Sequence, residues 1–322
     1  MKKTIGLFFR GMAMGAADVV PGVSGGTIAF ITGIYEELLR SIKSVDLEAL
    51  KLLLKSGPKA FWEKINGTFL LALFTGIIFS VISLAKGITY LLNEHPVLIW
   101  SFFFGLIIAS AIYIGKDIPK WNIRNVFALL VAALVAFYIT LATPTQGPEA
   151  LWFIFLSGFI AICAMILPGI SGSFILLLLG SYPIVLGTVS DTLSAIKASD
   201  WDLIVSGMTL ILIFILGCVI GLMSFARLLS WLFAAHKNLT LAILTGFMIG
   251  SLNKVWPWKE TLEFRINSKG EEVPFLEQNI LPAAYEQLYN TPSQLLPAIV
   301  LMVFGFGIVF LIEGVAKKME NK

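Results

Sequence analysis

The chain has 322 residues, of which 57% are hydrophobic and 13% are charged, and its formal net charge at pH 7 is only +3. Soluble domains carry about a quarter charged residues, so this composition excludes a soluble globular protein, and the small net charge gives no reason to expect a nucleic-acid partner. Several apolar runs reach the roughly 20 residues that a helix needs to cross a bilayer. Because these runs are continuous and do not alternate, they exclude a membrane β-barrel and predict an all-α polytopic membrane protein.

The first apolar segment, at about 4–39, is interrupted by DVVPGVSGGT at residues 18–27. Its basic head resembles that of a signal peptide, but no convincing small-residue cleavage site precedes Asp18, so we expect it to remain in the mature protein. Proline cannot continue a helical hydrogen-bond ladder, and glycine permits positive φ. Irregular backbone at membrane depth must be buried in protein or line a wet cavity, so Pro21-Gly22 is predicted to mark the tip of a re-entrant helical hairpin.

The rest of the chain alternates apolar runs with polar stretches. Mixed-charge stretches are predicted at 40–66 and 187–202, and a second interrupted segment at about 150–186. Residues 253–293 are polar and contain four prolines, so we expect one large external loop there and no separate soluble domain. The predicted crossing helices are at about 68–92, 97–115, 125–142, 203–234, 239–252 and 295–315.

The two interrupted segments resemble each other. VVPGVSGGTIAFITGIYEELL at 19–39 aligns without a gap on ILPGISGSFILLLLGSYPIVL at 166–186, a displacement of 147 residues. Farther along the chain the displacement is 141, which pairs Gly76 with Gly217, and His95 with His236. Since these are the only two histidines, the match indicates an internal duplication, with a first repeat at 1–147 and a second at 148–322.

Basic residues in short loops mark the cytoplasmic side of a membrane protein. The predicted loops outside the membrane carry few of them: 143–150 has no lysine or arginine, and 187–202 has three aspartates against one lysine. The basic residues placed inside are Lys2, Lys3, the five lysines of 40–66, Lys116, Lys120, Arg124, Lys237, Lys317 and Lys318. Both termini are then cytoplasmic. Each repeat has a hairpin and three crossings, so the repeats have inverted topology, as in many secondary transporters.

Each interruption is followed by groups that can bind an anion. Ser24 is placed to cap the helix that restarts there, and the amides of Gly25, Gly26 and Thr27 would face out of that helix start, a setting that favours phosphate. The second copy offers the corresponding groups of Ser171, Gly172 and Ser173. The motif is not a P-loop, because it has no lysine. The alternative is a kinked helix whose glycines serve only close packing.

Charged residues within membrane segments are functional candidates by default. Arg227, its counterpart Lys86, and Arg10 either attract a phosphate headgroup or extend to the interface and anchor their helices. Asp18, where the second copy has Met165, either couples transport to H⁺ or Na⁺ or is a capping or ion-paired aspartate. Cys163 and Cys218 are isolated and are expected to serve packing, so no metal site or cofactor is predicted.

The two motifs GAADVVPGVSGGTIAFITGIYEELL and ILPGISGSFILLLLGSYPIVL resemble the PopT-type polyprenyl-phosphate transporters, a bacterial family long known only as a domain of unknown function. The resemblance covers roughly residues 5–315. It implies a protein of the bacterial cytoplasmic membrane that returns undecaprenyl phosphate from the outer to the inner leaflet, where this lipid again serves cell-envelope synthesis. The family has Asn where this chain has Asp18, which leaves the coupling role of this position open.

Two other functions remain open from the residues alone. A membrane-embedded polyprenyl pyrophosphate phosphatase can also combine inverted repeats with a Pro-Gly-x-Ser motif, but here glycine follows Ser24 and Ser171, and no dense carboxylate cluster accompanies them. An ion-coupled transporter of small anions fits the same architecture. Besides its substrate, the protein is expected to contact membrane lipids, and a homo-oligomer is left open.

Overall fold

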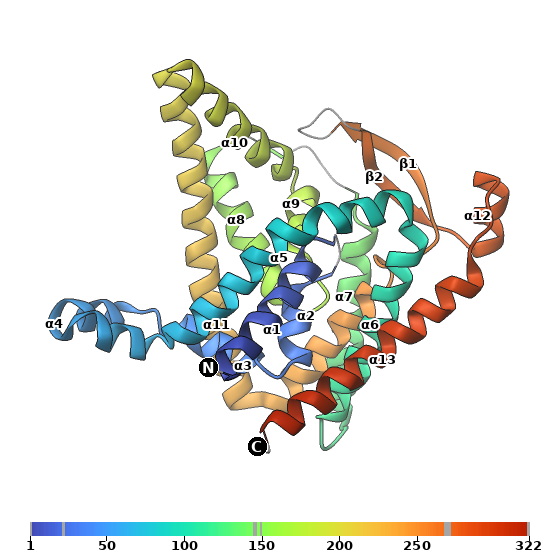
Figure 1. Ribbon diagram of the computed structural model, residues 1–322, viewed down its shortest axis with the longest axis horizontal. Coiled ribbons are helices and arrows are strands. Elements are labelled where there is room, and N and C mark those ends of the chain that lie inside the picture. The colour runs from blue at the N-terminus through green and yellow to red at the C-terminus, as the bar shows by residue number, and fades with distance from the viewer. Residues whose placement is uncertain (1, 21–22, 144–146, 149, 267–271, 321–322) are drawn as a thin grey trace.

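The computed structural model describes residues 2–20, 23–143, 147–148, 150–266 and 272–320, and most of these are helical (Figure 1). The helices of the first half are α1 (Lys2–Asp18), α2 (Gly25–Ile31), α3 (Tyr35–Lys43), α4 (Leu47–Lys64), α5 (Gly67–Glu94), α6 (Pro96–Lys116) and α7 (Ile123–Leu141). The second half contains α8 (Leu151–Ile166), α9 (Gly172–Leu178), α10 (Ser181–Ala198), α11 (Trp201–Ser251), β1 (Lys259–Ile266), β2 (Glu272–Asn279), α12 (Pro282–Tyr289) and α13 (Leu295–Glu320).

The apolar helices confirm a polytopic membrane protein. Within the described residues, four helices are long and apolar enough to cross a membrane: α5, α6, α7 and α11. The pair α9 and α10, bent by 102°, adds a fifth span if it is counted as one, while α8 and the Leu295–Leu311 part of α13 are shorter apolar helices. Predicted crossings at 68–92, 97–115 and 125–142 coincide with α5, α6 and α7 to within two residues at each end.

Two histidines break the helical run at matched positions. His95 separates α5 from α6 with φ −134° and ψ 50°, and Pro96 then begins α6, since proline is tolerated in the first turn of a helix. His236 has φ −142° and ψ 50° inside α11. The predicted crossings at 203–234 and 239–252 are therefore the two arms of one broken helix, and the break repeats the one between α5 and α6.

Glycines let helices of the same half approach closely. An added methyl group at any of four glycines would overlap a carbonyl oxygen of the facing helix or come within 2.6 Å of it. The pairs are Gly11 with Leu73 and Gly76 with Phe8, between α1 and α5, and Gly158 with Phe214 and Gly217 with Phe155, between α8 and α11. Every member of the first two pairs aligns with a member of the last two at the displacement of 147 or 141. Such small-residue faces are typical of packing in membranes.

The later helices pack across the halves. α6 lies against α13, where Gly105 faces the carbonyl of Met302 and Gly305 faces that of Phe102. The second arm of α11 lies against α7, where Gly246 faces the carbonyl of Leu129. Each half therefore packs its last crossing helix against a helix of the other half, and the core lies between them, around the first interrupted segment.

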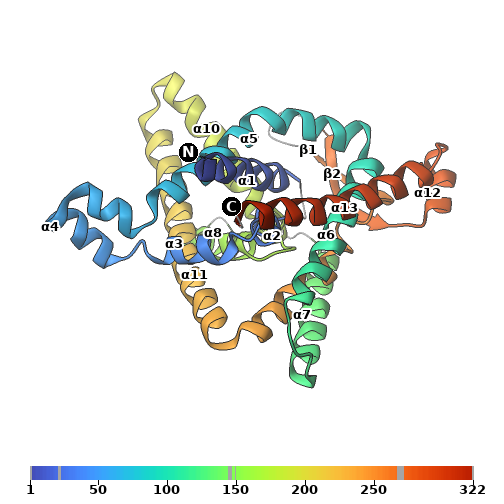
Figure 2. The same ribbon diagram turned by 60° about the horizontal axis from the view of Figure 1, so that its bottom comes forward.

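The segment predicted as a polar loop at 253–293 has its own structure. β1 and β2 form an antiparallel hairpin in which Lys259 pairs with Asn279, and α12 follows. Two indoles fix this region to its surroundings: Trp256 Nε1 donates to the carbonyl of Ile280 at 2.9 Å, and Trp258 Nε1 donates to that of Ser293 at 2.8 Å. The hairpin and α12 lie on the side of the molecule away from α4 (Figures 1 and 2).

The predicted mixed-charge stretch at 40–66 forms the end of α3 and all of α4, which projects from the bundle in both views (Figure 2). Asp46 accepts a hydrogen bond from the amide of Ala49 at 2.8 Å and so caps the start of α4. Gly57, with φ 85°, breaks the helix before Pro58. The exposed Leu47, Leu50 and Leu54 on this arm leave an apolar face outside the protein core.

Candidate functional site

The two interrupted segments, far apart in sequence, contact each other directly. Three of their hydroxyl side chains are buried: Ser24 is 1% exposed, Thr27 is not exposed at all, and Ser171 is 6% exposed, whereas Ser173 is exposed. An added methyl group at Gly26 would overlap the carbonyl oxygen of Ile166. Three hydrogen bonds join the segments: Ser24 Oγ donates to the Met165 carbonyl at 2.9 Å, Tyr35 donates to the Ile166 carbonyl at 3.1 Å, and the Gly169 amide donates to Thr27 Oγ1 at 3.1 Å.

Ser24 is the N-cap of α2, as the sequence predicts. Its backbone is extended, and its Oγ accepts from the amide of Gly26 at 3.0 Å. The amide of Thr27 donates to the carbonyl of Ser24 at 2.9 Å. These amides, predicted to face an anion, therefore have partners within the chain, and a ligand has to replace those bonds. Their role in binding phosphate stays a prediction. Pro21 and Gly22, the predicted tip, lie outside the described residues.

Asp18 lies at the end of α1 and binds the start of α2. Its Oδ1 accepts from the amide of Gly25 at 2.7 Å. An added methyl group at Gly25 would come within 2.6 Å of the same carboxylate, so the close approach requires glycine. This is the capping role that the sequence left open beside ion coupling, and the coupling role stays a prediction. In the second copy Ser171 makes no capping bond, and its Oγ lies 2.9 Å from Ser173 Oγ.

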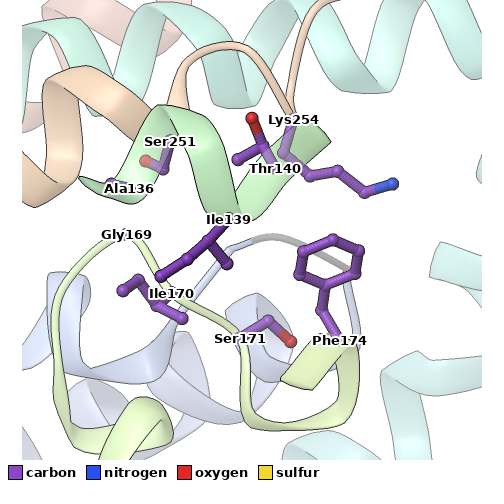
Figure 3. A pocket seen from close by; sticks show the side chains of 9 residues that line it. All are labelled: Ala136, Ile139, Thr140, Gly169, Ile170, Ser171, Phe174, Ser251 and Lys254. Atoms are coloured by element: carbon purple, nitrogen blue, oxygen red, sulfur yellow. The ribbon is translucent and has the colours of Figure 1, made fainter. Parts of the chain in front are cut away.

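A small cavity lies beside the second interrupted segment, where this segment meets α7 and the end of α11 (Figure 3). Its volume is about 10 Å³, which is room for about one water molecule. The lining combines apolar residues with three hydroxyl residues and one lysine. The residues are Ala136, Ile139, Thr140, Gly169, Ile170, Ser171, Phe174, Ser251 and Lys254.

Lys254 belongs to a cluster of three charged side chains at this end of the molecule. Glu277 Oε2 lies 3.5 Å from Lys254 Nζ and 3.3 Å from Lys259 Nζ. Lys254 also lies over the ring of Phe174, at 4.7 Å from its centroid, and Lys259 lies over Trp100 at 3.8 Å. Two ammonium groups therefore share one carboxylate, and the cluster has an excess of one positive charge.

Burial changes the titration of this cluster. It lowers the pKa of Lys259 to about 8; Lys254 adds to that effect and Glu277 opposes it. For Glu277, burial acts to raise the pKa, but the attraction of Lys259 and Lys254 outweighs it and holds the pKa below its ordinary value. Removing the carboxylate would thus leave two like charges facing each other in a poorly hydrated place.

Lys254, Lys259 and Glu277 are not among the site residues predicted from the sequence, because they fall in the segment predicted to be a polar loop. A signal was available: Lys254 follows Ser251 by three residues, and Ser251 aligns with Ser110 in the first half of the chain at the displacement of 141. The spacing placed a lysine beside a repeated serine, but nothing in the sequence showed that the chain turns there toward the second interrupted segment.

The cations predicted from the sequence lie elsewhere. Arg227 Nη1 donates to the carbonyl of Met223 at 3.2 Å, one turn earlier on its own helix. Lys86 is exposed and Arg10 is partly exposed. Within the described part of the chain, none of the three makes an ion pair within 4 Å or bonds to the interrupted segments. Their role in phosphate binding therefore stays a prediction.

A second, wider depression of about 380 Å³ lies at the beginning of α7, against the break in α11. It is polar and basic. Its lining includes Arg124, His236 and Lys237, together with three asparagines: Asn122, Asn125 and Asn238. The two hollows therefore lie at opposite ends of α7, one lined by Thr140 and the other by Asn125.

Known proteins resemble this chain over most of its length. Residues 14–273 match a family described as undecaprenyl phosphate translocase-like. A polyprenyl-phosphate transporter of Vibrio cholerae is 48% identical over 311 residues, which cover 97% of this chain and 96% of the relative. A polyprenyl-phosphate transporter of Staphylococcus aureus is 32% identical over 260 residues, covering 77% and 84%. No solved structure matches the chain.

Proposed function

Because this chain belongs to the undecaprenyl phosphate translocase-like family, we propose that it transports a polyprenyl phosphate across a bacterial cytoplasmic membrane. The substrate proposed is undecaprenyl phosphate, moved from the outer to the inner leaflet and returned to cell-envelope synthesis. Both relatives are named as transporters, and this chain is a transporter and not a phosphatase.

The observation that carries this proposal is the buried contact between the two interrupted segments. A lipid phosphate needs polar groups for its head and an apolar route for its tail. Hydroxyls of Ser24, Thr27 and Ser171 gather where the segments meet, all at most 6% exposed. The surrounding helices present large exposed apolar side chains to the membrane, including those of α5 and α11. The headgroup would bind at the contact while the tail stays in lipid.

Transport is proposed to proceed by movement of one repeat against the other. Matched glycine pairs and the matched breaks at His95 and His236 support a duplicated architecture, and the charge distribution of the loops supports its inversion. The bonds from Ser24 to Met165 and from Gly169 to Thr27 cross between the repeats. They would break when the site opens to one leaflet and form again when it closes.

Reconstitution tests this function. The purified protein is placed in vesicles with labelled undecaprenyl phosphate in one leaflet, and an impermeant reagent reports how much lipid remains accessible. We expect the protein to transfer the phosphate lipid faster than protein-free vesicles do, and to leave neutral undecaprenol unaffected. Equal rates with and without protein would contradict the proposal, and uptake of a small anion without lipid transfer would favour the ion-coupled anion transporter.

A further inference from the structure

We propose that Lys254 is the cation that binds the phosphate monoester of the substrate, at a subsite formed with the second interrupted segment. This inference rests on the proposed transport of a polyprenyl phosphate and assigns its headgroup to a residue outside both repeated motifs. Lys254 lines the same cavity as Ser171 and Thr140 (Figure 3). Its side chain is 20% exposed. The side chain is thus largely shielded from solvent but still accessible to a ligand.

Ser171, which lines the cavity together with Lys254, and its neighbour Ser173 can also provide a donor to a phosphate. Ser171 Oγ and Ser173 Oγ lie 2.9 Å apart and share one hydrogen bond. Two hydroxyls have two hydrogens, so this bond leaves one of them able to donate to a ligand. Thr140 Oγ1 donates to the carbonyl of Phe137 at 2.6 Å and accepts from Asn253 at 2.7 Å, which makes it a wall of the cavity and not a donor to the ligand.

The charge cluster supplies a positive charge without a dedicated partner. Lys259 is only 7% exposed and is held by both Glu277 and the face of Trp100. Lys254 lies farther from the same carboxylate, at 3.5 Å, and packs on Phe174. A charge that is largely buried needs a counter-charge. A bound phosphate would neutralise the charge of Lys254 and leave the ion pair of Lys259 and Glu277 intact.

The subsite is closed in this structure. Its volume of about 10 Å³ holds roughly one water molecule and is smaller than a phosphate group. The second segment lies directly on the end of α11: an added methyl group at Gly169 would come within 2.8 Å of Ser251 Oγ. The headgroup therefore enters only when the elements that line the cavity, which are this segment, α7 and the end of α11, move apart.

The first test compares Lys254→Gln with Lys197→Gln, which removes the same charge from an exposed position on α10. Native mass spectrometry measures binding of undecaprenyl phosphate and of undecaprenol, and vesicles measure transfer. We expect Lys254→Gln to weaken binding of the phosphate lipid about tenfold, to leave undecaprenol binding unchanged and to slow transfer, while Lys197→Gln matches the wild type. If Lys254→Gln lowers the melting temperature, Lys254→Met, which keeps the contact with Phe174, takes its place.

The second test uses a substitution that should strengthen binding of the phosphate lipid. Glu277 competes with phosphate for Lys254, so Glu277→Gln should strengthen binding of the phosphate lipid severalfold in a variant that still melts cooperatively. Weaker binding in folded Glu277→Gln would make the cluster structural and overturn the assignment. Displacement of the lipid by inorganic phosphate would show that free phosphate binds the same cation. Failure to displace it, together with the tenfold loss, would assign the site to the lipid headgroup.

The two proposals fail in different ways. A wild-type protein that neither binds nor transfers undecaprenyl phosphate contradicts the proposed function. A wild-type protein that transfers it, with Lys254→Gln and Lys197→Gln indistinguishable from it, contradicts only the role of Lys254.

Discussion

Single atoms decide whether the interrupted segments fit together. Gly26 approaches the carbonyl of Ile166 so closely that an added methyl group would overlap it. We predict that Gly26→Ala separates the segments, at a cost of about 1–3 kcal/mol for overpacking, and abolishes transfer of undecaprenyl phosphate. Scanning fluorimetry in detergent and the vesicle assay measure the two effects.

Gly87→Ala is the matched control for Gly26→Ala. It lies in α5, where the added methyl group would meet no described atom within 4 Å beyond the adjoining residues and backbone of its own helix, and alanine is a better helix former than glycine. We expect unchanged or slightly higher stability there. A Gly26→Ala protein with the stability and rate of the wild type would show that the two segments do not contact each other in the membrane.

Asp18 offers a second prediction at this scale. Its carboxylate accepts from the amide of Gly25, so Asp18→Ala should destabilise the protein by about 1 kcal/mol, the usual loss for a helix cap. Asp18→Asn keeps an acceptor oxygen and should melt near the wild type. Equal melting of the Ala and Asn variants would contradict the capping role. A transfer rate that loses its pH dependence in Asp18→Asn would add ion coupling to the role of this residue.

The residues of the site differ in how far the sequence predicts them. Ser24 could be predicted as a cap because serine before a restarting helix satisfies a local rule. Lys254 could not, because its position depends on where a long helix ends and how the chain then turns. The partner of the Gly26 amide follows from the same rule, because Ser24 is that cap. That Asp18 accepts from the amide of Gly25 did not follow, since the sequence named no partner for this carboxylate.

The β-hairpin is the element with the clearest pH dependence. The pKa of Lys259 is about 8 in the folded protein against an ordinary value of 10.5, mainly because of burial. The folded state thus binds fewer protons than the unfolded state between these values, and stability rises with pH there. Below pH 8 the penalty for the buried charge is fully present.

We therefore expect the melting temperature of the wild type to rise between pH 8 and pH 10 relative to that of Lys259→Met, which carries no charge at this position. Below pH 8 the two curves should run parallel. Fluorimetry of both proteins across this range measures the difference, and a wild-type curve that falls relative to the variant above pH 8 would contradict the burial of Lys259.

Elements with long apolar runs were predictable and the hairpin was not. The spans of α5, α6 and α7 follow from hydropathy, since only a helix satisfies its backbone groups within the membrane. In β1, Leu262 and Phe264 alternate with Glu263, which is a strand pattern. This pattern is short and lies next to prolines. The pairing of β1 with β2 also depends on contacts distant in sequence, such as the hydrogen bond from Trp258 to Ser293.

The orientation of the whole molecule can be tested by labelling. Thr143, at the end of α7, is exposed and suits a cysteine, whereas an added side-chain atom at Gly147 would overlap the carbonyl of Leu179. With Cys163 and Cys218 replaced by alanine, we expect Thr143→Cys to react with an impermeant thiol reagent added outside intact cells. Lys120→Cys, at the other end of α7, should react only after the membrane is opened. The reverse pattern would contradict the proposed topology.

The proposed division into two repeats rests on residue matches, and these matches do not predict which helices pack across the two halves of the chain. Displacements of 147 and 141 align the glycines that face neighbouring backbones. They do not tell which helix supplies the facing backbone, because a glycine face fits any smooth helix surface. The pairing of α6 with α13 and of α7 with α11 follows from how all the helices pack together.

This pairing also sets the order in which the protein is completed during synthesis. α6 ends at Lys116, and its partner α13 begins at Leu295, about 180 residues later. At roughly 5–20 residues per second, the ribosome needs on the order of 10 to 40 s to make that stretch. During this time the glycine face of α6 contacts lipid or the insertion machinery and not its final neighbour. The packing of the first half is therefore complete only after the last helix of the chain has been synthesised.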